Sequence, residues 1–191
     1  MNERNATNVI IGRVRFSYVH VFKAEAVATG SDAKFSLSLI IPKSDTALLN
    51  KIKGAINAAA QAGIGKLGGK IPANLKTPLR DGDVEKPDDE AYAGCYFINA
   101  SSKTRPGVGK KVNGKYVEIT DESEVYSGCY GYASVNFFVF NTSGNKGVAA
   151  GLNNVLKTQD GEYLGGRVSG AAEFGGSEFE DMQDDLPSDI F

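Results

Sequence analysis

Residues 125–141, VYSGCYGYASVNFFVFN, form the longest β pattern in the chain. Side chains of a strand alternate between two faces, and here one parity is rich in aromatic residues while the other is small or apolar. The small residues Cys129, Gly131 and Ala133 suit the inner wall of a tightly curved barrel. The pattern therefore predicts a barrel strand whose tyrosines, Tyr126, Tyr130 and Tyr132, face outward.

Two earlier segments also show the period of two that marks half-buried strands. In residues 8–16, Ile10, Val14 and Phe16 share one parity, and two arginines share the other. In residues 34–41, four apolar residues alternate with Lys34, Ser36 and Ser38. We expect both segments to be strands, and Pro42 to end the second.

Residues 44–62 predict the one sizeable helix. Ser44 or Asp45 can cap its start, an apolar stripe recurs at helical spacing, and Gly63 follows its end. Residues 146–158 favour a strand followed by a short helix, because Leu152, Val155 and Leu156 allow helical spacing.

These elements predict one mainly β domain over residues 1–172, built as an OB-like five-stranded barrel with one sizeable helix. Short strands separated by turn signals, with 23 glycines in 191 residues, favour a barrel over an α/β fold. Residues 173–191 contain few apolar residues and no base, so we expect a disordered acidic tail.

Charge is distributed unevenly along the chain. From Glu173 to Phe191 there are seven acids and no base, whereas residues 1–172 hold all 21 bases and have a net charge of +5. Residues 81–90 contain six acids and one base, and we expect them to form a solvated loop. Residues 91–117 contain five bases and no acid, and Asn113-Gly114 predicts a tight turn within a flexible hairpin.

Several function classes are disfavoured by composition. No apolar run is long enough for a transmembrane helix or a signal peptide. Two cysteines and one histidine, His20, offer almost no zinc ligands, so we expect no metal and no cofactor. Residues 63–68 match a dinucleotide-binding glycine pattern but follow a helix instead of a strand. No catalytic constellation is visible, and we do not expect an enzyme.

The positive signal is a basic and aromatic β surface. Proteins that bind single strands combine a positive groove with aromatic side chains on which bases stack. The residues that we expect to contact nucleic acid are Arg15, Lys34, Tyr92, Tyr96, Lys103, Arg105, Lys110, Lys111, Lys115, Tyr126, Tyr130 and Tyr132.

The C-terminus resembles the acidic tip of bacterial single-stranded DNA-binding proteins, in which acids precede a terminal phenylalanine. Here Asp-Ile-Phe stands where the bacterial tip usually has Ile-Pro-Phe. The resemblance implies a tail that recruits replication or recombination proteins through Asp184, Asp185, Leu186, Pro187, Asp189, Ile190 and Phe191.

The body resembles a family of phage and prophage single-stranded DNA-binding proteins of the OB-fold type. The resemblance rests on Asn8–Tyr18, on Phe35–Pro42 leading into a capped helix, on Gly128–Tyr132 followed by Asn136-Phe137-Phe138, and on the segments from Gly147 to Gly166. It implies sequence-nonspecific binding of single-stranded DNA during phage replication or recombination, in the cytoplasm of the bacterial host. A strand-annealing recombination protein and a virion structural protein remain alternatives, and association into a homodimer stays open.

Overall fold

The computed structural model describes residues 6–165 of the chain. Its elements in chain order are β1 (Asn8–Glu25), β2 (Lys34–Pro42), α2 (Thr46–Ala62), β3 (Leu79–Asp81), α3 (Gly82–Glu85), the 3-10 turn η1 (Glu90–Tyr92), β4 (Cys95–Ser102), β5 (Gly107–Val112), β6 (Lys115–Glu118), the 3-10 turn η2 (Glu122–Glu124), β7 (Tyr130–Thr142) and β8 (Asn145–Gln159).

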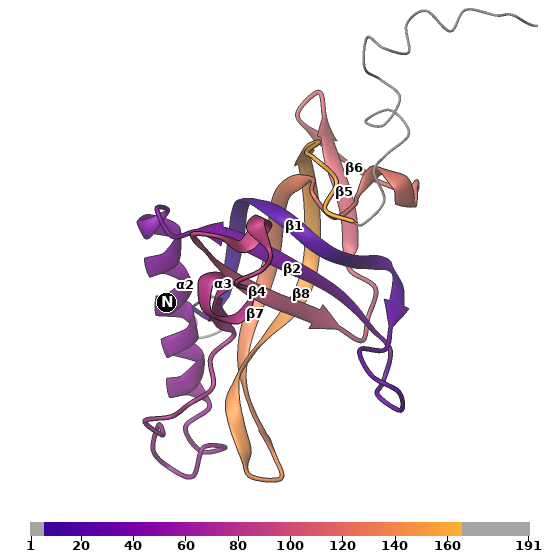
Figure 1. Ribbon diagram of the computed structural model, residues 1–191. Coiled ribbons are helices and arrows are strands. Elements are labelled where there is room, and N and C mark those ends of the chain that lie inside the picture. The colour runs from indigo at the N-terminus through magenta and orange to yellow at the C-terminus, as the bar shows by residue number, and fades with distance from the viewer. Residues whose placement is uncertain (1–5, 166–191) are drawn as a thin grey trace, which may run out of the picture.

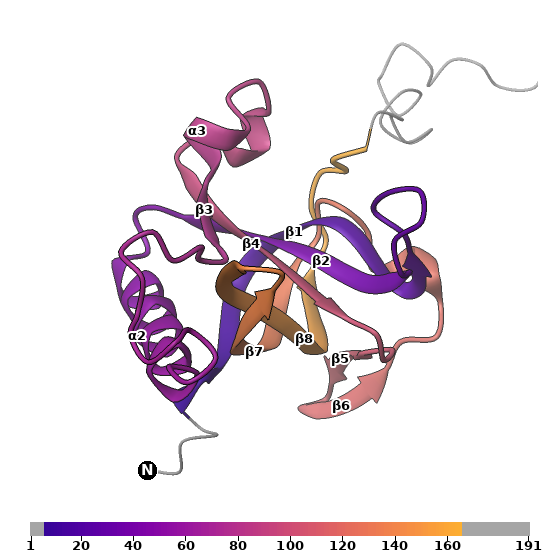
Figure 2. The ribbon, with the colours of Figure 1, turned by 90° about the horizontal axis from the view of Figure 1, so that it is seen from below.

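Five of these strands close a barrel in the order β1–β2–β4–β8–β7 and back to β1 (Figures 1 and 2). The pairs are antiparallel except for β4 and β8, which run parallel and meet through Ala100↔Ala150 and Ser101↔Gly151. Strand β3 extends the sheet from β4, and β5 joins β8 with β6 at its edge. The prediction of an OB-like five-stranded barrel with one sizeable helix is confirmed.

Strand β7 has the predicted faces. Ala133 is fully buried, Gly131 lies at the wall, and Tyr130 and Tyr132 point outward and are half-buried. The predicted hairpin is also present, because β5 and β6 are joined at Asn113-Gly114, both with positive φ (50° and 77°). A two-residue turn with positive φ at both positions has a backbone twist that matches the twist of the flanking strands.

The predicted faces of the first strand are wrong at Ile10, which is 61% exposed, whereas Val9 and Ile11 are buried. Pairing with β7 explains the difference: Ile11 lies opposite Ala133 and Val14 opposite Gly131, so Gly12 and Arg13 together face one residue. Such a bulge shifts the parity of every residue before it relative to those after it.

The short helix expected near residue 155 is absent, because β8 continues to Gln159. Leu152 pairs with Val135 and Asn154 with Ser134, which leaves Asn153 as an extra residue in β8. This second bulge spaces Leu152 and Val155 three residues apart while both stay buried, and that spacing imitates a helix.

Residues 81–90 are not the solvated loop that their charge predicts. The Asp81 side chain caps α3 and the Asp89 side chain caps η1. Lys43 Nζ lies 2.7 Å from carboxylate oxygens of both Asp81 and Asp83. Four of the six acids are used locally: Asp81 and Asp89 as caps, and Asp81, Asp83 and Glu85 as ion-pair partners of Lys43 or Arg80. Asp83 also accepts a hydrogen bond from Gly94 N–H, next to the start of β4.

Helix α2 begins where the sequence predicts. The Asp45 carboxylate accepts a hydrogen bond from Leu48 N–H at 3.1 Å, and Gly63 is the C-cap. Its apolar stripe packs on β1, β7 and β8. Within residues 6–165, no helix is long and apolar enough to cross a membrane.

The close packing at Gly131 gives a stability prediction. A Cβ there would lie 2.2 Å from the Leu156 carbonyl oxygen and 2.7 Å from the Phe16 ring. We expect Gly131→Ala to lower the free energy of unfolding by about 1–3 kcal/mol, measured by chemical denaturation.

The matched control is Gly54→Ala on α2, where a Cβ meets nothing within 4 Å. This substitution should raise the free energy of unfolding by about 0.5–1 kcal/mol, because glycine loses more backbone entropy in a helix. Equal stabilities for the two variants would contradict the close packing at Gly131.

Candidate nucleic-acid interface

The outer face of β2 and β4 carries small polar side chains. Ser36 lies opposite Ser101 and Ser38 opposite Asn99, while Leu37 and its neighbours of like parity point into the core. In OB-type barrels the outer face of the second and third barrel strands commonly binds oligonucleotides. This face is therefore a candidate surface for nucleic-acid binding.

Part of this face is covered. Tyr92 of η1 is fully buried, packs edge-on against Phe97 at 5.1 Å between ring centroids, and shares a 3.2 Å hydrogen bond with the Ser38 hydroxyl. Both faces of the Tyr92 ring lie inside the protein, so in this structure the ring offers no exposed face for the base stacking predicted from the sequence.

The open part forms a groove of about 490 Å³, here called the β2–β4 groove. Its lining residues include Tyr18 and His20 of β1, Ser36 and Ser38 of β2, Lys86, and Asn99 and Ser101 of β4.

Tyr18 and Lys86 form the most distinctive contact of the β2–β4 groove. Tyr18 is 53% exposed, and its backbone has a positive φ of 45°. Lys86 Nζ lies 4.6 Å from the centre of the Tyr18 ring and donates a hydrogen bond to its hydroxyl at 3.2 Å. Within residues 6–165, Lys86 forms no ion pair. An exposed ring beside an unneutralised ammonium can stack a base and bind its phosphate.

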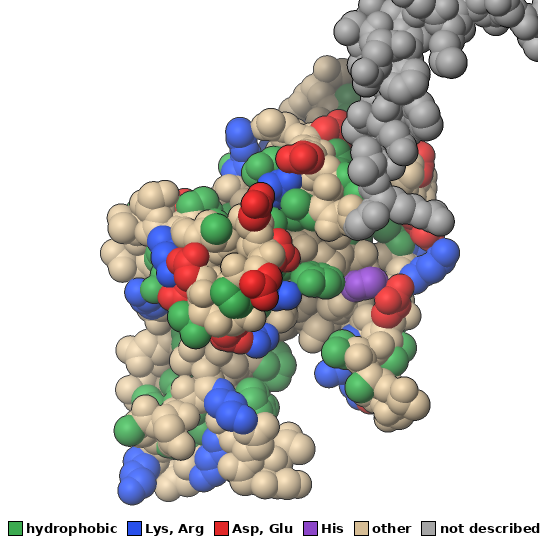
Figure 3. Space-filling model, viewed as in Figure 1, with side chains coloured by type: hydrophobic (Ala, Val, Ile, Leu, Met, Phe, Trp, Pro, Cys, Tyr) green, Lys and Arg blue, Asp and Glu red, His purple; other side chains and the backbone are tan. Residues whose placement is uncertain are grey.

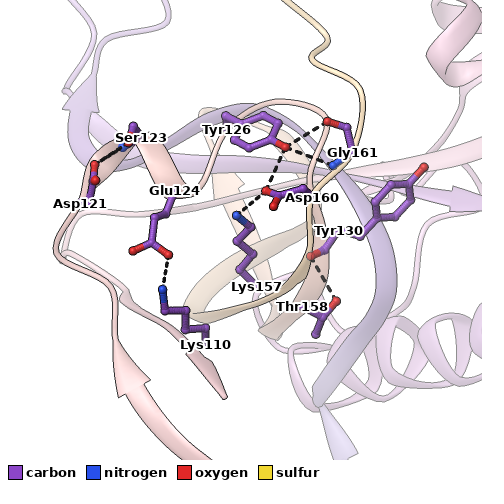
Figure 4. A network of polar contacts seen from close by, with 10 residues as sticks. All are labelled: Lys110, Asp121, Ser123, Glu124, Tyr126, Tyr130, Lys157, Thr158, Asp160 and Gly161. Carbon is purple, nitrogen blue, oxygen red and sulfur yellow. Dashed lines mark hydrogen bonds and ion pairs between the residues drawn. The ribbon is translucent and has the colours of Figure 1, made fainter. Parts of the chain in front are cut away.

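A larger groove of about 870 Å³ lies between the β5–β6 hairpin and strands β7 and β8, and we call it the hairpin groove. It brings together three of the predicted residues, Lys110, Lys111 and Tyr132. Lys110 is, however, paired with Glu124, and Lys157 with Asp160 at 2.6 Å (Figure 4). The larger groove thus has less free positive charge than its lysines suggest.

The remaining predicted cations and Tyr96 lie in other parts of the molecule. Lys103 pairs with Asp32 at 2.8 Å, which lowers the pKa of that carboxyl, and Arg105 lies 5.7 Å from the Phe22 ring centre. Tyr96 lies near α2, with Lys43 and Lys53 5.0 and 5.9 Å from its ring centre. Lys34 and Lys115 are exposed, at the start of β2 and of β6.

Arg15, Tyr126 and Tyr130 anchor the segment that follows β8. Arg15 donates to the carbonyls of Gly128 and Glu162. Tyr130 packs beside Gly161 (Figure 4). The Tyr126 hydroxyl lies 3.1 Å from Asp160 Oδ1 and accepts from Gly161 N–H at 3.1 Å.

The pKa values of this network follow from its contacts. The pKa of Asp160 lies below its ordinary value because Lys157 and then Tyr126 donate to it. Burial raises the pKa of the Tyr126 hydroxyl. These contacts give Tyr126 a structural role in addition to the predicted binding role.

The predicted tail residues Asp184, Asp185, Leu186, Pro187, Asp189, Ile190 and Phe191, and the domain boundary at residue 172, lie outside the described residues.

Tyr18 and Lys86 are not among the binding residues that the sequence predicted. The serines of β2 offered a signal for Tyr18, because they mark the solvent face of a barrel strand that Tyr18 adjoins. Lys86 offered no signal, since it is the one base of the acidic segment and reaches the groove only through α3.

Comparison with known proteins places this fold among phage proteins. A family model described as the ssDNA-binding protein of Enterobacter phage Enc34 matches residues 7–187. Putative protein p50 of Acyrthosiphon pisum secondary endosymbiont phage 1 is 32% identical over 171 residues, which cover 86% of this chain and 90% of that protein.

Solved structures agree with this match. The single-stranded DNA-binding protein from bacteriophage Enc34 in complex with ssDNA is 27% identical, covers 83% of this chain and 90% of its own, and superposes with a TM-score of 0.69. The single-stranded DNA-binding protein gp2.5 of bacteriophage T7 is 13% identical, with a TM-score of 0.56 over 84% of this chain and 96% of its own. At that identity the T7 protein shows a shared fold alone.

Tyr126 gives a test that separates anchoring from base stacking. Tyr126→Phe removes the hydroxyl bonded to Asp160 and Gly161 and keeps the ring. We expect the free energy of unfolding to fall by about 1 kcal/mol in chemical denaturation, with unchanged affinity for oligo-dT.

Tyr163→Phe is the control, because Tyr163 is 48% exposed and its hydroxyl forms no hydrogen bond within residues 6–165. Loss of oligo-dT affinity by Tyr126→Phe at unchanged stability would show that the hydroxyl contacts DNA instead.

Proposed function

The chain belongs to the family of phage single-stranded DNA-binding proteins described for Enterobacter phage Enc34, and from this we propose that it binds single-stranded DNA without sequence preference. The observation that carries the proposal is the β2–β4 groove, where the exposed Tyr18 ring lies beside Lys86, which has no ion-pair partner in the described part of the chain. Every base has a π-face and every nucleotide a phosphate, so this pair of contacts does not select a sequence.

The small polar residues of the groove complete the proposed site. Ser36, Asn99 and Ser101 offer hydroxyl and amide groups that bond to base edges or to phosphates. Their small size lets a nucleotide approach the backbone of β2 and β4. The exposed lysines Lys111 and Lys115 are proposed as additional phosphate contacts beyond this groove.

We further propose that the protein acts in phage DNA replication or recombination, inside the bacterial host cell. Membership of the family favours a strand-binding role over that of a virion structural protein.

Alanine variants of two tyrosines with nearly equal exposure test which groove binds the bases. Tyr18 in the β2–β4 groove is 53% exposed and Tyr116 in the hairpin groove is 54% exposed. We expect Tyr18→Ala to weaken oligo-dT binding by about 5- to 150-fold, the value of one stacked base. Tyr116→Ala should leave the affinity nearly unchanged, and both are measured by fluorescence titration.

Tyr18→Phe is the matched control, since it keeps the ring and should keep the affinity. A loss with Tyr116→Ala but not with Tyr18→Ala would move the bases to the hairpin groove. The same titrations with duplex DNA and with RNA test the proposed preference for single-stranded DNA.

We propose that the acidic tail competes with DNA and, when displaced, recruits replication or recombination proteins. Leu164 packs against the cluster of Ile40, Tyr92 and Phe97 on the β2–β4 face. The described chain therefore ends beside the proposed site, and the residues that follow carry seven acids and only Arg167 as a base. A tethered segment reaches an effective concentration in the millimolar range.

Deleting residues 178–191 should therefore raise oligo-dT affinity, most strongly at low salt where screening is weakest. Phe191→Ala removes no charge and should leave DNA affinity unchanged while weakening partner recruitment. Equal affinities of the deleted and full chains at low salt would remove the competing tail from the proposal.

A further inference from the structure

Besides residues 91–117, two longer stretches of the chain contain no acid. Residues 46–78 and 125–159 hold seven lysines and no Asp or Glu. They form α2, the loop that follows it, β7 and β8. Within residues 6–165, only Lys157 among these seven lysines forms an ion pair, with Asp160.

The fold fixes part of this acid-free region in place. Asn141 Nδ2 donates to the Lys66 carbonyl at 3.0 Å, Lys146 Nζ to the Leu67 carbonyl at 3.0 Å, and Val148 N–H to the Lys76 carbonyl at 2.8 Å. The Leu67 side chain is buried in the core. The loop is thereby held along the end of the β7–β8 hairpin, and we call the two together the basic lobe.

The basic lobe presents exposed lysines and an exposed ring. Lys66, Lys70 and Lys76 are exposed, and Phe138 on the outer face of β7 is 46% exposed. In Figure 3 the lower left part of the molecule, where Figure 1 places this hairpin end and loop, shows Lys and Arg but no Asp or Glu. Acids a Debye length or more away, about 8–10 Å, do little to weaken its field.

A row of small polar residues links the β2–β4 groove to the lobe. Ser36 lies opposite Ser101, Ser101 opposite Gly151, and Gly151 opposite Asn136. Residues directly opposite share a face of the sheet, so this row crosses β2, β4, β8 and β7 on the outside. Strands lie about 4.8 Å apart, so the row spans roughly 15 Å.

The row ends beside Phe138. This residue lies two positions after Asn136 in β7 and therefore points to the same face. Its neighbour on that face, Phe140, packs over Gly147, next to the Lys76 carbonyl. Phe140 thus connects the Phe138 face of β7 to the lysine-bearing loop at the far end of the row.

We propose that the basic lobe is a second binding region for the same single strand of DNA. The strand leaves the β2–β4 groove, crosses the row at Gly151, stacks a base on Phe138 and places its phosphates against Lys66, Lys70 and Lys76. This inference rests on the proposed function, since it extends the strand that the β2–β4 groove binds.

Oligonucleotide length separates the two regions, because OB folds bind about 4–16 nucleotides. We compare oligo-dT of about four and about fifteen nucleotides, the two ends of that range. Phe138→Ala should weaken binding of the long strand by about 5- to 150-fold, the value of one stacked base, and leave the short strand unchanged. Replacing Lys66, Lys70 and Lys76 by alanine should lower the log–log salt slope for the long strand by about 2, at roughly 0.7 per phosphate contact.

Matched variants control for loss of structure. Phe138→Tyr keeps a ring, and arginine at the three lysine positions keeps the charge, so both should bind the long strand like the unaltered protein. Ile10→Ala removes a side chain that is 61% exposed in the hairpin groove, and it should not change the affinity for either oligonucleotide.

Two outcomes would overturn the second region: equal losses for both lengths, or no loss for either. A fall in melting temperature that matches the lost affinity of Phe138→Ala would overturn the stacking role. If the unaltered protein binds neither oligonucleotide, the proposed function itself fails, and that result is distinct from failure of the lobe.

Discussion

The barrel depends on one short seam, the parallel pairing of β4 with β8 through Ala100–Ala150 and Ser101–Gly151. The two alanines point into the core and are small enough for the strands to meet there. Their neighbours point outward and make the outer face continuous from β2 to β7. Gly151 suits this position, because a Cβ would lie 2.6 Å from Asn136 Oδ1. The same contact therefore closes the fold and connects the two surfaces proposed to bind DNA.

Local signals predicted the elements whose geometry is set locally. The cap at Asp45, the strand β2 ending at Pro42 and the turn at Asn113-Gly114 are set within a few residues, and all three appear where expected. The alternation in β2 predicted one exposed face, but Ser38 and Ile40 of that face are buried as well. The two bulges were missed because each is defined by a partner strand. Both bulges, Gly12-Arg13 in β1 and Asn153 in β8, exist only in the pairing of these strands with β7. In a bulge, two residues of one strand lie opposite a single residue of the partner strand. The residue pattern of one strand alone does not show this pairing.

The candidate site was harder to predict than the fold, since residue type does not show burial or ion pairing. Tyr92 is of a residue type that stacks on bases, but it is buried against Phe97 and Ser38. Lys86 belongs to an acidic segment, yet four of its acids serve as helix caps or pair with Lys43 and Arg80. Among the described residues 6–165, Lys86 has no ion-pair partner and lies beside Tyr18. The sequence predicted a ring beside a cation, and the proposed site has that chemistry on residues other than the predicted ones.

Ion pairing also explains why a count of lysines overstates the charge that a surface offers to DNA. A lysine already paired, such as Lys110 with Glu124 or Lys157 with Asp160, must give up that contact before it binds a phosphate. An exposed pair is worth only about 0–1 kcal/mol, but the carboxylate left behind repels the incoming phosphate. Lys66, Lys70 and Lys76, which form no ion pair within residues 6–165, meet neither cost. Their separation from acids along residues 46–78 therefore favours the basic lobe over the hairpin groove as a path for phosphates, although the hairpin groove is the larger hollow.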